Sequence, residues 1–216
     1  MIPIAPATQL ITLLGLLLGV HQTASAAPIT FEQASFGRLS TYTESGFTTS
    51  AVSGPWVVTN SYGQPAPFIQ FINGAGQNPL TATIQITNDN STFKFSSVDL
   101  YSSITPIPYV IKGLLNSTAV FSLEGTVPNT FGNFQTVVNS NSNYLIDKLI
   151  ISLTNPAAPC CSNPMGLDNI TVTPMKTTSV PEPSSSLFFL LGLPVVTWLH
   201  LRNLNPRSTI LKKKSY

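Results

Sequence analysis

The chain has 216 residues, of which 43% are apolar and only 8% are charged, against about 25% charged residues in an average soluble protein. This apolar share can build a core, which excludes a wholly disordered chain, and the low charge leaves hydroxyl and amide groups to solvate the surface. The net charge of +2 arises in the C-terminal tail, because residues 27–179 hold seven acids and five bases. A nucleic-acid-binding protein carries its basic patch on the folded domain, so nucleic acid is excluded as a partner.

The first 26 residues have the organisation of a secretory signal peptide. An apolar core runs from Leu10 to Val20, and small residues at 24–27 supply a cleavage site, although no Lys or Arg precedes the core. We expect export, with cleavage after Ala26 or Ala27. A folded ectodomain is then expected at residues 27–174.

Short alternating or β-branched runs fill residues 29–173, separated by clusters of Gly, Pro, Asn and Ser. They predict an all-β fold, an antiparallel β-sandwich or jelly roll of eight or nine strands. The alternation is clearest at residues 81–87, TATIQIT, where the three apolar residues share one face. A change of apolar phase predicts a β-bulge near Ser96 and Ser97.

The ectodomain contains no histidine, because the two in the chain are His21 and His200. Ser-His-Asp catalysis needs an imidazole to move the nucleophile's proton, and typical catalytic zinc sites use one as a ligand. A glycosidase needs only two carboxylates, but no spacing among the acids singles out a pair. We therefore expect a protein that is not an enzyme.

Four aromatic residues are candidates for stacking on a sugar: Trp56, Tyr42, Tyr62 and Tyr101. Binding pockets typically combine apolar or aromatic walls with a few placed polar groups, and Gln64 lies near Tyr62 in the sequence. The alternative for Trp56 is a place in the core, where a tryptophan in a strand usually lies.

Among the acids, Asp168 has the least usual position in the alternation of apolar and polar residues. It has the same parity as Ile170 and Val172, so a regular strand would point it toward the core, where an unpaired carboxylate is costly. We expect it at a sheet rim, bonded to a backbone turn, or bound to a cation. Glu44, just before Gly46, is expected to be a solvated turn residue.

The two cysteines, Cys160 and Cys161, are adjacent. A disulfide normally joins Cα atoms about 4.4–6.8 Å apart, whereas neighbours across a trans peptide are about 3.8 Å apart. The sequence predicts either two loop thiols or a strained ring that stiffens one turn, with a redox or metal role as the alternative.

Residues 175–186 form a linker rich in Pro and Ser, which cannot build a core. The apolar run at 187–201 would span about 22 Å as a helix, so it crosses a hydrocarbon layer of roughly 30 Å only if it extends back through Ser184. Basic residues follow in the tail, as expected on the cytoplasmic side.

The order of a Val-Pro-Glu-Pro box, a Ser stretch, a Leu/Gly-rich run and Arg202 resembles the PEP-CTERM sorting signal of exported bacterial proteins. The resemblance implies a recognition box at Pro181, Glu182 and Pro183, and a transient inner-membrane anchor at 187–216. It also implies processing by an exosortase, a membrane cysteine protease. One departure is that Arg202 stands alone, with the lysine run ten residues later. The alternative is a plain C-terminal membrane anchor behind a proline linker.

The ectodomain is more loosely similar to a jelly-roll domain common among PEP-CTERM proteins. The similarity rests on "ITFE" at 29–32, "YTESGFTTS", "FKFSSVDLYS", "YVIKGLL" and "GLDNITV" at 166–172, taken in that order. It implies an architecture like galactose-binding-like and carbohydrate-binding modules, with a structural Ca²⁺ held by Glu32, Asp168 and backbone carbonyls. An all-oxygen shell suits Ca²⁺, and the alternative is that Asp168 accepts hydrogen bonds from a turn.

These features predict an exported, non-catalytic protein of the cell surface or extracellular matrix that binds a glycan or exopolysaccharide at a shallow aromatic site. The alternative is a passive structural or adhesive surface protein without a defined ligand site. The expected partners are an exosortase, the inner membrane transiently, and extracellular polysaccharide. The one cofactor that the resemblance implies is structural calcium.

Overall fold

The computed structural model describes residues 25–89 and 91–175. All the regular secondary structure within these ranges consists of strands, so the described part of the chain is all-β. The expected signal peptide, the linker with its Pro-Glu-Pro box and the sorting segment lie wholly or mainly outside the described residues. Within the described part of the chain, no helix is long and apolar enough to cross a membrane.

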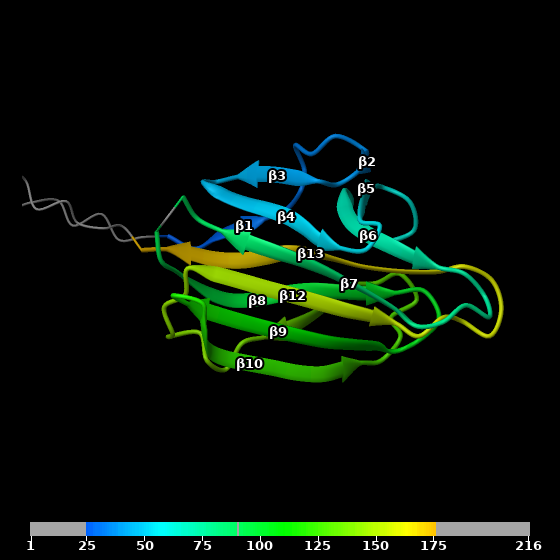
Figure 1. Cartoon of the computed structure of the whole chain (residues 1–216). Helices are drawn as coiled ribbons and strands as arrows, with labels where there is room; N and C mark the ends of the chain where they lie inside the picture. The colour runs from blue at the N-terminus through cyan, green and yellow to red at the C-terminus, as the bar shows by residue number, and fades with distance from the viewer. Residues whose placement is uncertain (1–24, 90, 176–216) are drawn as a thin grey trace, which may run out of the picture. The chain divides into compact units, whose positions relative to one another are not determined.

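Thirteen strands form two antiparallel sheets, which we call sheet A and sheet B (Figure 1). Sheet A has the order β11 (Gln135–Val138), β8 (Phe93–Ser102), β13 (Asn163–Pro174), β6 (Phe68–Asn73), β5 (Val57–Thr59) and β2 (Gly37–Arg38), and β1 (Ala27–Ile29) also pairs with β13. Sheet B has the order β10 (Thr118–Val127), β9 (Ile107–Leu115), β12 (Lys148–Asn155), β7 (Leu80–Thr87), β4 (Phe47–Ser53) and β3 (Thr41–Glu44).

The prediction of an all-β antiparallel sandwich is confirmed for the described residues, but the predicted number of strands is too low. Five of the thirteen strands, β1, β2, β3, β5 and β11, have four residues or fewer. Such short segments contain too few alternations to be recognised from the sequence.

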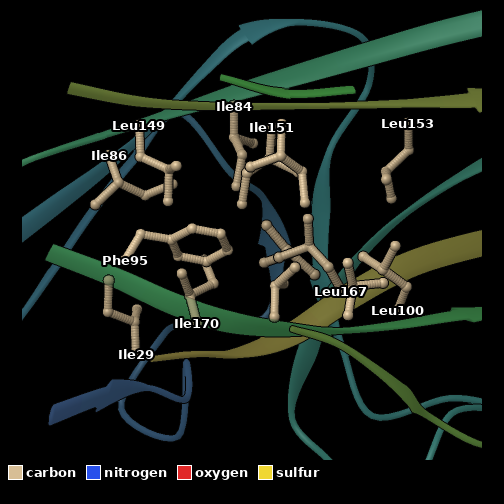
Figure 2. Close-up of a cluster of buried hydrophobic side chains, with 14 of the residues drawn as sticks. Ile29, Ile84, Ile86, Phe95, Leu100, Leu149, Ile151, Leu153, Leu167 and Ile170 are labelled. Atoms are coloured by element: carbon tan, nitrogen blue, oxygen red, sulfur yellow. The ribbon is translucent and has the colours of Figure 1, made fainter. Parts of the chain in front are cut away.

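The core lies between the two sheets and is lined by the alternate residues of their long strands. In β7, Ala82, Ile84 and Ile86 have no exposed surface, whereas their polar neighbours are partly exposed, which confirms the predicted alternation. Figure 2 shows side chains of both sheets facing one another, among them Ile84, Ile86, Leu149, Ile151 and Leu153 of sheet B, and Ile29, Leu100, Leu167 and Ile170 of sheet A.

A β-bulge in β8 changes the phase of its buried residues. Phe95 and Ser97 pair with consecutive residues of β13, which leaves Ser96 as the extra residue. Asn139 completes the hydrogen bonding at this point, because its backbone N–H donates to the Ser96 carbonyl at 2.8 Å and its buried amide donates to the Phe95 carbonyl at 2.9 Å. The bulge predicted near Ser96 and Ser97 is confirmed.

A second bulge, in β13, places Asp168 on the opposite face from the one predicted. Asp168 pairs with Asp99 of β8, and an extra residue follows it before the register resumes. Asn169 adopts a φ of 48°, a left-handed conformation that Asn tolerates better than most residues. Leu167 and Ile170 both lie in the core, so Asp168 lies on the outer face of sheet A. The parity prediction is wrong because it assumed an unbroken strand.

Three buried asparagines join the two sheets at one end of the sandwich. The Asn73 amide of sheet A donates to the Asn155 carbonyl of sheet B at 3.2 Å. The Asn155 amide donates to the Asn163 carbonyl at 2.6 Å, and the Asn163 amide donates back to Asn155 Oδ1 at 3.0 Å. Asn155 Oδ1 also accepts from the backbone N–H of Ala157 at 3.1 Å. The loop between β12 and β13 is therefore fixed at its base.

Asn155→Ala should lower the free energy of unfolding by about 2 kcal/mol, because it removes the hydrogen bonds that Asn155 makes with the buried Asn163 and with the half-buried N–H of Ala157. Chemical denaturation of the purified chain measures the change. Asn143→Ala, at an exposed asparagine, is the matched control and should leave stability almost unchanged. Equal effects of the two substitutions would contradict this role for Asn155.

Candidate functional site

Four aromatic rings form a cluster on and beside the outer face of sheet A, separate from the core between the sheets. This aromatic cluster comprises Tyr62, Phe68, Tyr101 and Phe134. Tyr101 is its centre: its ring centroid lies 5.0 Å from Phe68, 5.2 Å from Phe134 and 6.3 Å from Tyr62. The Phe68 and Phe134 centroids lie 5.6 Å apart. Phe68 and Tyr101 are fully buried, and Tyr62 is 51% exposed.

Tyr101 lies across β13 and fixes the cluster to the sheet. Its hydroxyl donates to the side-chain carbonyl of Gln70, which lies in β6 on the far side of β13. Gly166 separates the two, and a Cβ atom there would lie 2.7 Å from the Tyr101 ring and 2.3 Å from the Ile69 carbonyl oxygen. A side chain at Gly166 would therefore displace the ring. Burial is the main cause that raises the pKa of Tyr101, and the nearby Tyr62 adds to it. The Tyr101 hydroxyl therefore stays neutral and donates its proton to the hydrogen bond.

Two loops meet above this cluster and hold its exposed members. The backbone N–H of Gln64 donates to the Gly132 carbonyl at 3.2 Å, and Gln64 also forms a β-bridge with Asn133. Gly132 lies so close to the Tyr62 ring that a Cβ atom would be 2.9 Å from it. Beside Gly132 stands Phe131, which is 73% exposed. We call four exposed residues of these loops, Tyr62, Gln64, Phe131 and Asn133, the loop platform.

Both exposed rings of the loop platform lie on strained backbone. Tyr62 has a φ of 87° and Phe131 a φ of 51°, values that bulky residues rarely adopt. Such conformations persist only where the surroundings impose them, and they concentrate at functional sites. The second loop is held by Thr130, whose hydroxyl donates to the Ser102 carbonyl at 3.2 Å and accepts from the Ser102 N–H at 3.0 Å. The two rings are therefore presented on a fixed support.

The four aromatic residues predicted to stack on a sugar do not gather at one place. Trp56 has no exposed surface and packs edge-on against Phe71 at 5.0 Å, so the core alternative describes it. Tyr101 is also fully buried and supports the platform, which corrects its predicted role as a stacking ring. Tyr42 lies in β3 of sheet B, against Phe31 at 5.4 Å. Tyr62 alone keeps the predicted exposure.

Asp168 is a buried carboxyl group with an unpartnered oxygen. It is 2% exposed, and its Oδ1 has no hydrogen-bond partner among the described residues. Burial raises its pKa to about 7, a backbone hydrogen bond from Asn169 opposes the rise, and the carboxylates of Asp99, Glu44 and Glu32 add to it. A group of this kind is either protonated or paired with a cation when the protein is folded.

Glu44 is not the solvated turn residue expected from the sequence. Its carboxylate accepts hydrogen bonds from the N–H groups of Thr30 and Phe31, at 2.8 and 3.1 Å, and from the Thr30 hydroxyl at 2.9 Å. It thereby holds the turn after β1 against β3. Phe31 itself adopts a φ of 59°, and these bonds support that conformation.

The calcium site implied by the resemblance stays a prediction. Asp168 offers a free buried oxygen, and Glu32 is exposed in the turn after β1, whose strand pairs with β13 beside Asp168. The described residues bring no group of three or more ligating side chains together. A Ca²⁺ at Asp168 would thus draw most of its ligands from backbone carbonyls and water, with Glu32 as the second acid.

Sequence reasoning missed Phe131 and Asn133, which lie about 70 residues from Tyr62 in the chain. Their local sequence, NTFGNF, is a polar turn with two aromatic residues, and that combination was the available signal. It also missed Asp99, whose carboxylate accepts from Thr136 at 2.6 Å and from the Asn169 amide at 3.0 Å. Only the strand order places these residues together.

No protein-family model and no curated protein matches this chain. Among solved structures, a family 29 carbohydrate-binding module from Piromyces equi is similar, with 12% identity and a TM-score of 0.44 over 73% of this chain and 95% of that one. A family 32 carbohydrate-binding module from C. perfringens NanJ, in complex with galactose, has 14% identity and a TM-score of 0.38 over 60% of this chain and 98% of that one. At these scores, neither likeness carries an argument about function.

The raised pKa of Asp168 predicts that stability falls as pH rises from about 4 to about 7. Across that interval the folded chain keeps a proton that the unfolded chain has released, so the slope of stability against pH is negative. Asp168→Asn should remove this component and be more stable than the wild type at about pH 8, as measured by melting temperature.

Calcium distinguishes the two explanations of Asp168. If Asp168 holds Ca²⁺, the ion should raise the wild-type melting temperature at about pH 8 and a chelator should lower it, with no effect on Asp168→Asn. If Asp168 is only a protonated acid, neither reagent acts. Asp89→Asn, at an exposed acid, is the control and should behave as the wild type.

Proposed function

We propose that this chain is an exported, non-catalytic glycan-binding protein whose sugar site is the loop platform. The observation that carries the proposal is the pair of exposed rings, Tyr62 and Phe131, on two loops that are bonded to each other. Rings that stack on a ligand must remain exposed and fixed before binding, because ordering them during binding reduces affinity.

The composition of the loop platform supports a polar ligand with apolar faces. The exposed amides of Gln64 and Asn133 stand on the same two loops as the rings and can donate to and accept from hydroxyl groups. The Asn133 amide already donates to the Thr130 carbonyl at 3.1 Å, which leaves its carbonyl free to accept from a ligand. Sugars present both kinds of surface, with C–H faces and hydroxyl edges.

The tyrosine at position 144 provides a matched control for this proposal, since Tyr144 and Tyr62 are both 51% exposed. Tyr62→Ala and Phe131→Ala should each weaken binding to a polysaccharide by about tenfold, or about 1.4 kcal/mol. Tyr144→Ala should leave affinity unchanged. Affinity electrophoresis against a panel of neutral and acidic polysaccharides measures the effect, with melting temperature as the check on folding.

Absence of wild-type binding to every polysaccharide would favour the second candidate, a passive structural or adhesive surface protein. Binding that survives both ring substitutions would instead move the sugar site away from the loop platform. In either case the strained loops would need another explanation.

We further propose that export proceeds through the N-terminal signal and that the C-terminal segment is an exosortase sorting signal. The support is the order of elements in the sequence: the box at 181–183, the apolar run at 187–201 and the basic tail. The expected destination is the cell surface or extracellular matrix, after transient anchoring in the inner membrane.

Intact mass of the protein recovered outside the cell tests the sorting proposal. The expected chain begins at Ala27 or Pro28 and ends near the Pro-Glu-Pro box, without the apolar run. Glu182→Ala should cause the unprocessed chain to accumulate in the membrane fraction. Recovery of extracellular protein that keeps residues 187–216 would contradict processing and favour a plain membrane anchor.

A further inference from the structure

The loop between β12 and β13 carries both cysteines of the chain at its surface. Cys160 and Cys161 are exposed and free, and the sequence contains no third cysteine. The loop platform uses neither of them. Two adjacent, exposed thiols therefore require an account separate from sugar binding.

The loop that presents the thiols is held firmly at both ends. Asn155 precedes it and Asn163 follows it, and both belong to the buried asparagine network that joins the sheets. The Asn163 side chain also accepts from the backbone N–H of Ile104 at 3.0 Å. Two prolines, Pro156 and Pro159, restrict the chain between these anchors. Both ends of the loop are thus anchored to the core.

The two thiol groups belong to consecutive residues, whose Cα atoms are about 3.8 Å apart. Cys161 adopts a φ of 70°, which only a constrained turn holds in a residue with a side chain. A disulfide within the pair would need to bridge Cα atoms only about 3.8 Å apart, below the usual range.

We infer that Cys160 and Cys161 form a two-thiolate binding site for a soft, two-coordinate cation, with Cu(I) as the ion that fits best. Thiolates are soft ligands and select ions such as Cu(I) and Zn²⁺. Structural Zn²⁺ almost always requires four protein ligands, whereas the described residues bring no third His, Cys, Asp or Glu to the pair. Two thiolates complete the coordination of Cu(I), so the site is complete within one chain.

Binding is balanced by the release of protons. Each thiol gives up its proton as its sulfur bonds to Cu(I), so one ion displaces two protons and no electron is transferred. Affinity should therefore increase with pH.

Anaerobic titration of the reduced full chain with Cu(I), against bicinchoninate as a competing chelator, tests the inference. One Cu(I) should bind per chain, with a thiolate-to-copper absorption band. Cys160→Ser and Cys161→Ser should each weaken binding by more than about 100-fold, the upper range for losing an outer hydrogen-bond partner of a ligand. Both cysteines are exposed, so melting temperature should change little.

Ser162→Ala, at the exposed residue next to Cys161, is the matched control and should bind Cu(I) as the wild type does. Three results would overturn the inference: no uptake by the reduced chain, one ion per two chains, or Zn²⁺ binding as tight as Cu(I). The outcome is independent of the sugar site, because Tyr62→Ala should retain full Cu(I) binding while losing polysaccharide.

Discussion

The register between β8 and β13 is the constraint on which the arrangement of this protein depends. Each strand carries one extra residue, Ser96 in β8 and one after Asp168 in β13, and the two bulges lie close together in the same ladder. They reverse which residues face the core partway along the two longest strands of sheet A. On one side of the bulges, Tyr101 and Gly166 face outward; on the other, Phe95 and Ile170 remain buried between the sheets. The bulges thus give one sheet two apolar surfaces.

That second surface explains why several aromatic residues are buried without belonging to the main core. Phe68 and Tyr101 act as a foundation for the two loops above them, and Tyr101 anchors that foundation through Gln70. A ligand would meet only the outermost rings. The sequence does not distinguish a buried aromatic residue from an exposed one. Only an exposed ring, however, can contact a ligand directly.

The sequence predicts the sandwich well and the site poorly, for one physical reason. Alternation in β7 and the phase change at Ser96 are local properties, and both are confirmed. Asp168 was assigned to the wrong face because a single inserted residue inverts parity, and Asn169 gives little warning of it. Phe131 was missed because its partnership with Tyr62 depends on a bond between distant loops, from Gln64 to Gly132. A local sequence pattern predicts which face of a strand a residue occupies, whereas the order of the strands decides which distant residues lie beside it.

The pairing of β1 with β13 has a mechanical consequence. Ala27 lies opposite Val172, so the described chain enters and leaves the domain at one end of sheet A (Figure 1). A force that pulls on residue 175 acts along the axis of β13, because this strand ends at Pro174. Because β13 is bonded to β8 on one side and to β6 and β1 on the other, and ladder bonds run perpendicular to the strands, such a pull loads many bonds in shear at once. A domain tethered through its C-terminal side would therefore resist unfolding when fluid flow pulls on it.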